Sequence, residues 1–96
     1  MKIVFAVKSD SKQKAEDLLK KDDEINRGSI TVRSASSLDI SEDCYFILLD
    51  ASEHIVEKAK HLLKGVAEVY KNHEKVIEKI TEQEDAATEG FGNILG

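Results

Sequence analysis

The chain of 96 residues contains no proline, no tryptophan and one cysteine, Cys44. A single cysteine forms no disulfide within the chain, which is typical of proteins in a reducing compartment. No apolar run approaches the roughly 18 residues of a membrane-spanning helix; the longest are Ile3–Val7 and Tyr45–Leu49. The first ten residues predict a strand and not a signal peptide. We therefore expect a cytoplasmic protein without a membrane partner.

Positive charge is also scarce. The chain has 14 Lys and Arg residues against 19 Asp and Glu residues, giving a formal net charge of −5, and its only arginines are Arg27 and Arg33. Nucleic-acid-binding modules carry a basic excess and use Arg for phosphate and base contacts. The composition therefore argues against a nucleic-acid partner. A surface rich in Lys and Glu favours an archaeal or bacterial origin.

The length fits one domain. We expect a single α+β domain over residues 1–84 and a C-terminal tail over residues 85–96. Within the domain, residues 2–8 and 44–50 are apolar on both alternating faces, which is typical of strands inside a sheet. Residues 29–35 alternate apolar and polar side chains and predict a half-exposed edge strand.

Two amphipathic helices are predicted, one ending near Lys21 and one beginning near Ser52. Residues 22–28 between the first helix and the edge strand are predicted to be a loop. In the polar connection 36–43, the apolar Leu38 and Ile40 are expected to fix the chain. Each helix is preceded by a capping-box pattern, in which a side chain accepts a bond from the free N–H groups of the helix start. The two pairs are Asp10 with Gln13 and Asp50 with Glu53.

Residues 66–71 decide between two folds. Gly65 stands where a helix C-cap glycine is expected, so residues 66–71 predict a fourth strand, followed by a last helix from Asn72. The competing interpretation is one helix over residues 52–84, because apolar residues recur there at spacings of three and four. That helix would span about 50 Å, whereas a domain of this size has a radius of gyration of about 13 Å. We therefore favour the strand.

The favoured order is β-α-β-β-α-β with an extra C-terminal helix, a ferredoxin-like two-layer α+β sandwich. The alternative is β-α-β-β-α with one long C-terminal helix. The ferredoxin-like arrangement leaves one apolar face of the sheet to be covered by a second chain or by the C-terminal segment. We therefore expect a homo-oligomer such as a dimer. His73 is expected to be solvated in the first turn of the last helix.

The sequence contains no strong catalytic or metal-binding motif. His54, Glu57 and His61 lie on one helix face, but the two histidines are about 10.5 Å apart along the axis, too far to reach one ion easily. Cys44 has no base beside it in the sequence, and Asp43 would raise its pKa, so we interpret it as a core residue. We predict no catalytic residue, no metal site and no cofactor.

The tail is apolar for a chain end. Phe91, Ile94 and Leu95 are spaced so that one helical turn places all three on one side. This turn either packs on its own domain or forms a short docking segment that inserts into a groove on another chain. These three residues are the predicted partner-binding residues.

Two functions fit these observations. The first is a non-enzymatic module that self-associates and binds a protein or a small ligand. The alternative is a small enzyme or ligand-binding subunit whose site forms at a dimer interface. A concave pocket with converging titratable groups would favour the enzyme, and a flat apolar patch would favour the interaction module.

Overall fold

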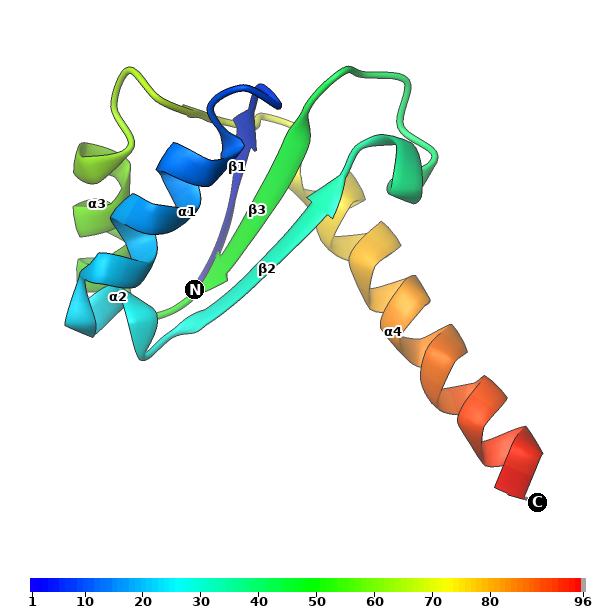
Figure 1. Ribbon diagram of the computed structural model, residues 1–96. Coiled ribbons are helices and arrows are strands. Elements are labelled where there is room, and N and C mark those ends of the chain that lie inside the picture. The colour runs from blue at the N-terminus through cyan, green and yellow to red at the C-terminus, as the bar shows by residue number, and fades with distance from the viewer. Residues whose placement is uncertain (96) are drawn as a thin grey trace.

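Four strands form one antiparallel sheet in the computed structural model, which describes the backbone of residues 1–95 and the side chains of residues 1–84. The sheet order is β2-β3-β1-β4, and all neighbouring strands are antiparallel (Figure 1). β1 and β3 are therefore central, as their two apolar faces predict, and β2 lies at an edge, as its alternation predicts. The strands are β1 (Lys2–Val7), β2 (Ser29–Ser34), β3 (Tyr45–Asp50) and β4 (Glu68–Val69).

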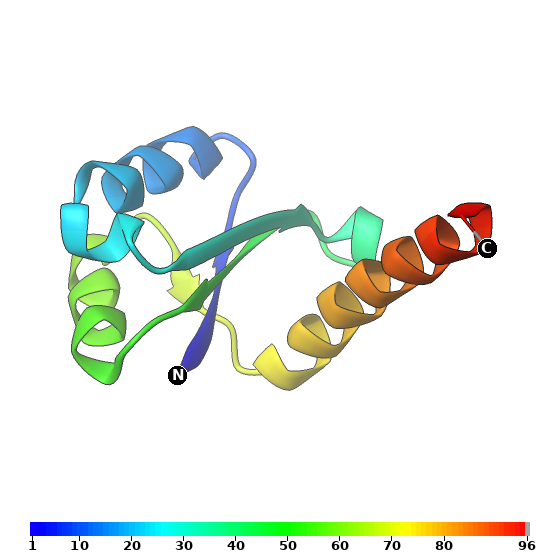
Figure 2. The ribbon, with the colours of Figure 1, turned by 90° about the horizontal axis from the view of Figure 1, so that it is seen from below.

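Helices cover both faces of this sheet, so the fold is a mixed α+β arrangement. Figure 2 shows α1, α2 and α3 on one side of the sheet and α4 on the other. No described helix is long and apolar enough to cross a membrane. The helices are α1 (Lys12–Lys21), α2 (Asp23–Asn26), α3 (Glu53–Leu62) and α4 (His73–Leu95), with a short 3₁₀ helix η1 (Ser36–Leu38).

The two faces of the sheet build two separate apolar clusters, because successive strand residues point to opposite faces. On the α1/α3 face, Phe5 and Ile47 pack against buried helix residues such as Leu19 and Val56. On the other face, the buried residues come from the strands, the connection after β2, and α4. They are Val4, Ala35, Leu38, Ile40, Phe46, Leu48, Val76 and Ile80.

The C-terminal helix thus covers the second face of the sheet. Val76 and Ile80 of α4 are fully buried against the strands. The Phe46 ring also meets the ring of Tyr70, which precedes α4, with centroids 4.7 Å apart. Of the two covers expected from the sequence, the C-terminal segment is the one the structure shows. His73 is exposed at the start of α4, as predicted.

The continuous-helix alternative is wrong. α3 ends at Leu62, and Gly65 has a φ of 83° in the left-handed region, where a side chain would be strained. The chain turns there and enters β4. This strand is shorter than the predicted 66–71, because pairing with β1 covers only two residues. Beyond it, the Tyr70 N–H donates to the Val4 carbonyl at 2.9 Å.

Residues 22–28 are not simply a loop, because they contain α2. The Asp22 carboxylate accepts hydrogen bonds from the N–H groups of Glu24 and Ile25 at 3.0 and 3.1 Å, which satisfies donors at the helix start. By contrast, Leu38 and Ile40 are buried in the connection after β2, as predicted.

Both predicted capping boxes are wrong. The N-caps are Ser11 for α1 and Ser52 for α3, and neither side chain makes a capping hydrogen bond. The Gln13 side chain instead donates to Asp17 at 3.0 Å. Asp50 ends β3 and lies 3.8 Å from the N-terminal ammonium. Each helix therefore starts one or two residues later than the predicted boxes require.

Candidate functional site

A cavity of about 580 Å³ opens at one end of the sheet, where β1 and β4 separate. Segments from distant parts of the sequence form its wall. They are the end of β1 with Lys8, the turn residues Asp10 and Ser11, Cys44 just before β3, and residues 65–68, which lead from the end of α3 into the first residue of β4.

The backbone explains why the cavity lies here. The β1–β4 ladder stops at the pair Ala6–Glu68. Just before β4, the N–H groups of Val66 and Ala67 both donate to the Leu63 carbonyl at 2.9 Å. This segment therefore folds back on the end of α3 and does not continue the ladder alongside the last residues of β1.

The turn from β1 into α1 forms another part of the lining. The Ser11 N–H donates to the Lys8 carbonyl at 3.0 Å, which closes this turn. α1 then begins without a side-chain cap and without an acidic residue in its first turn. The first N–H groups of a helix have no partner inside the helix, and they form the positive end of its dipole. These N–H groups follow Ser11, which lines the cavity.

The charged side chains of the lining have both signs. Lys8 contributes an ammonium group, and Asp10 and Glu68 contribute carboxylates, all three on exposed residues. Such a lining offers both donors and acceptors to a bound molecule. It does not select strongly for one sign of charge.

Cys44 lines the cavity and is half-buried. Burial raises the pKa of its thiol, and the nearby carboxylates of Glu42 and Asp43 raise it further. The predicted effect of Asp43 is thus confirmed. Because the thiolate is the reactive form, a raised pKa leaves Cys44 a poor nucleophile at neutral pH.

The three residues of the weak metal motif have separate environments. His54 Nε2 lies 3.9 Å from a carboxylate oxygen of Glu24, and Glu57 pairs with Lys60 at 3.1 Å. His61 is an exposed residue at the end of α3. Within residues 1–84, no group of three His, Cys, Asp or Glu side chains is placed to hold a metal ion.

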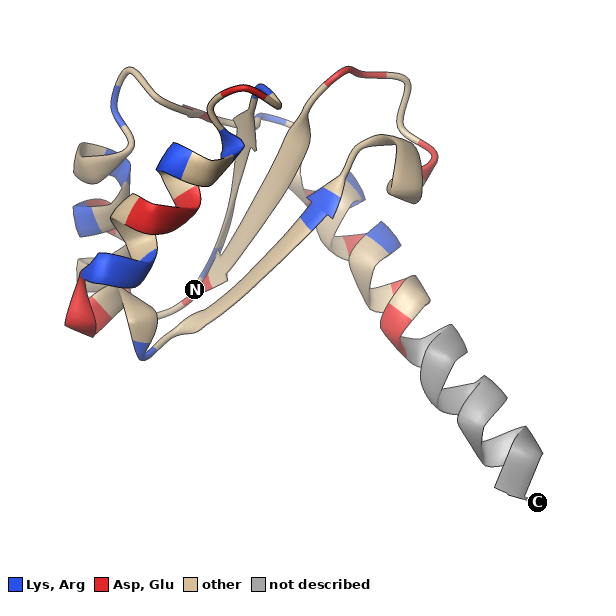
Figure 3. Cartoon of the chain, in the orientation of Figure 1, with Lys and Arg blue, Asp and Glu red and all other residues tan. Residues whose placement is uncertain are grey.

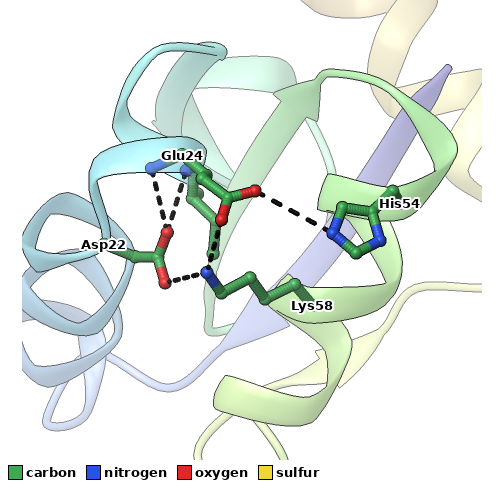
Figure 4. A network of polar contacts seen from close by, with 5 residues as sticks. Asp22, Glu24, His54 and Lys58 are labelled. Carbon is green, nitrogen blue, oxygen red and sulfur yellow. Dashed lines mark hydrogen bonds and ion pairs between the residues drawn. The ribbon is translucent and has the colours of Figure 1, made fainter.

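The Glu24 carboxylate belongs to a charged network that joins α2 to α3 (Figure 4). Lys58 Nζ lies 2.8 Å from Asp22 Oδ2 and 3.3 Å from Glu24 Oε1. The hydrogen bond from Lys58 lowers the pKa of Asp22, and the same bond raises the pKa of Lys58. Since Asp22 also caps α2, we interpret this network as a structural link between two helices.

Charges of both signs are mixed over the described surface. Figure 3 shows basic and acidic residues next to one another on α1. A basic stripe along one element, the usual mark of a nucleic-acid interface, is not seen in the part of the chain whose side chains are described. The expectation that nucleic acid is not a partner remains a prediction.

The predicted partner-binding residues Phe91, Ile94 and Leu95 lie outside the residues whose side chains the structure describes. None of the cavity residues was predicted as a binding residue. The turn glycine Gly65 was the only signal of this site in the sequence, and it indicated the end of a helix rather than a cavity. Comparisons with protein families, curated proteins and solved structures find no match to this chain, so the site is interpreted from its own geometry.

Proposed function

We propose that this protein is a non-enzymatic module that binds a small polar ligand in the cavity between the ends of β1 and β4. The observation that carries the proposal is the cavity itself. Its volume of about 580 Å³ lies within the roughly 300–1,000 Å³ of small-molecule sites. Its lining combines Lys8, two carboxylates and backbone near the start of α1, which suits a ligand with both donor and acceptor groups.

The small-enzyme alternative has less support. A catalytic thiol needs a lowered pKa or an adjacent base. The only thiol is Cys44, and burial and neighbouring carboxylates raise its pKa. The lining therefore favours binding without covalent chemistry.

We also propose that the fold is ferredoxin-like. Its support is the strand order β2-β3-β1-β4 with antiparallel neighbours, together with the order of the main elements along the chain. In this interpretation α2 and η1 are small additions, and α4 is an added helix on the second face.

Self-association, a cytoplasmic location and docking through the tail remain predictions. The argument for self-association from a bare sheet face is weaker now, because Val76 and Ile80 cover that face. Truncation after Glu89 tests the tail. If stability is unchanged and self-association is lost, the tail is a docking segment. If stability falls by more than about 1 kcal/mol, the tail packs on its own domain.

The ligand proposal is tested by titration followed in ¹H–¹⁵N correlation spectra. The probes are acetamide, glycine, acetate and methylammonium, which separate neutral, zwitterionic, anionic and cationic chemistry. We expect saturable shifts from at least one probe, confined to Lys8, Ser11 and residues 65–68. The proposal would be contradicted if none of the four probes gives saturable shifts, or if the shifts spread evenly over the surface.

A matched pair of variants locates the binding. Lys8→Gln removes the ammonium group of the lining and is expected to weaken binding of the responding anionic or zwitterionic probe at least threefold. Lys20→Gln makes the same substitution at an exposed position of α1 outside the lining, and we expect it to leave binding unchanged. Equal effects of the two variants would show that general charge, and not the cavity, governs the response.

A further inference from the structure

β2 presents an open edge of the sheet. Among residues 1–95, whose backbone is described, its only partner strand is β3, with which it pairs over all six of its residues. In an antiparallel ladder, alternate residues exchange hydrogen bonds with the partner strand, and the residues between them direct their N–H and C=O groups outward. An outer strand of this length is a template on which another strand can pair.

The register shows which backbone groups point outward. The ladder pairs Ser34 with Tyr45, and the next N–H along the chain, that of Ala35, donates to the Cys44 carbonyl at 2.9 Å. Bonded positions therefore fall on odd-numbered residues of β2. The residues that direct their backbone groups outward are Ile30, Val32 and Ser34.

Side chains of the same chain occupy two of these three outward carbonyls. Arg33 Nη1 donates to the Val32 carbonyl at 2.9 Å. Ser37 Oγ donates to the Ser34 carbonyl at 2.7 Å, while the Ser37 N–H donates to Ser34 Oγ at 3.3 Å. Both contacts agree with this register. If the Val32 and Ser34 carbonyls pointed toward β3, they would accept hydrogen bonds from that strand and would not be free for these side chains.

Without these donors, β2 could pair with β2 of a second copy of the chain. β2 contains no proline, lysine or acidic residue, which are the usual protections of an edge. In an antiparallel pair centred on Val32, Arg33 of one copy would lie opposite Thr31 of the other, so no like charges would be directly opposed. The half-exposed side chains of Ile30 and Val32 would be covered by the pairing. The opposite edge, β4, has only two residues.

We infer that Arg33 and Ser37 guard the β2 edge against pairing with β2 of a second copy. Their donors fill the carbonyls that the second strand would need. Pairing therefore requires these two hydrogen bonds to be broken in each of the two copies before new ones form. The Arg33 charge adds repulsion, because in the centred register the two arginines are diagonal neighbours on one face.

The test measures self-association by analytical ultracentrifugation across the micromolar range. The double variant Arg33→Thr/Ser37→Ala removes both donors and keeps a good strand former in β2. We expect its association constant to rise at least about tenfold over that of the unaltered protein. The matched control Arg27→Thr/Ser41→Ala makes the same substitutions at exposed positions outside β2, and we expect no rise.

A third variant shows whether the new association uses the β2 edge. Val32→Pro, added to the double variant, removes an outward N–H and leaves the bonds to β3 in place. We expect it to return association to the unaltered level. The inference is overturned if the double variant does not associate more strongly than the control, or if Val32→Pro leaves its association unchanged.

Amide hydrogen exchange on the unaltered protein gives a check that does not depend on folding of the variants. The N–H groups of Ile30, Val32 and Ser34 should exchange quickly, whereas those of Thr31 and Arg33 should be protected by β3. Protection of the first three at low protein concentration would show that the edge is already covered, and would overturn the inference.

Discussion

Replacement of Ile80 by Ala tests whether α4 is an integral layer of the domain. The side chain is 1% exposed and packs in the cluster on the second sheet face. The substitution removes three carbon atoms, and each buried methylene contributes about 0.8 kcal/mol, so the transfer loss is about 2.4 kcal/mol. The cavity that remains adds to this loss, and measured Ile→Ala changes in cores fall at about 2–5 kcal/mol.

Urea denaturation followed by circular dichroism measures this loss. Ile77→Ala is the matched control, because it makes the same change on the same helix at a half-buried position, and it should cost clearly less. A loss below about 0.5 kcal/mol for Ile80→Ala, typical of an exposed site, would refute the described packing of α4. Helix propensity favours Ala over Ile at both positions, so equal losses for both variants would show that the difference in burial between Ile80 and Ile77 does not set the cost.

Three other changes have defined outcomes. Asp22→Asn keeps an N-cap residue but removes the charge whose pKa is lowered by Lys58. The variant should be less stable than the unaltered protein by its full amount above the ordinary pKa of 3.8. This difference in stability should vanish as the pH falls through the lowered pKa of Asp22 in the folded protein. Thermal unfolding at several pH values measures the difference, and a difference that does not depend on pH contradicts the reasoning. Gly65→Ala should cost about 1–2 kcal/mol from the left-handed backbone alone, since a Cβ there meets nothing within 4 Å; a neutral effect in urea denaturation would contradict the turn geometry. Cys44 should react with iodoacetamide at neutral pH more slowly than a free thiol, because its pKa is raised; an equal rate would show that the thiol is not shielded.

The strands of the central sheet could be predicted because burial on two faces leaves a continuous apolar run. Residues 2–8 and 44–50 have this pattern, and β1 and β3 are the central strands. The edge position of β2 followed from its alternation in the same way. These predictions succeed because the position of a strand in the sheet decides how many of its faces are buried, and the buried faces carry the apolar residues.

The helix starts and the short helix were harder to predict. An acidic residue followed three residues later by Glu or Gln resembles a capping box, yet Ser11 and Ser52 are the N-caps. α2 was missed because residues 22–28 are polar apart from Ile25 and the helix has only four residues. Asp22, followed by two acidic residues, was the available signal for its start.

The regular apolar spacing across Gly65 was the support for the competing long-helix interpretation, which the structure contradicts. Val66 packs near the α1/α3 cluster and Val69 is exposed in β4, whereas Val76 and Ile80 lie on the second face. Residues that are regularly spaced in the sequence therefore lie on different faces of the sheet. A heptad pattern cannot show that the chain reverses between two of its members.

The cavity and the guarded edge could not be predicted from the sequence. The cavity forms where residues near positions 8, 44 and 66 meet, and these segments share no motif. The contact between Arg33 and the Val32 carbonyl depends on which backbone groups remain unpaired, which requires the register with β3. Both features arise from tertiary placement and not from local pattern.

The central claim is that the cavity between β1 and β4 binds a small polar molecule. Intermolecular nuclear Overhauser effects on the complex with the responding probe test it most directly. We predict contacts from the probe to the methyl groups of Ala6 and Ala67, which both line the cavity. Contacts confined to α4 or to the β2 edge, or no contacts with the cavity methyl groups at saturating probe, would contradict the claim.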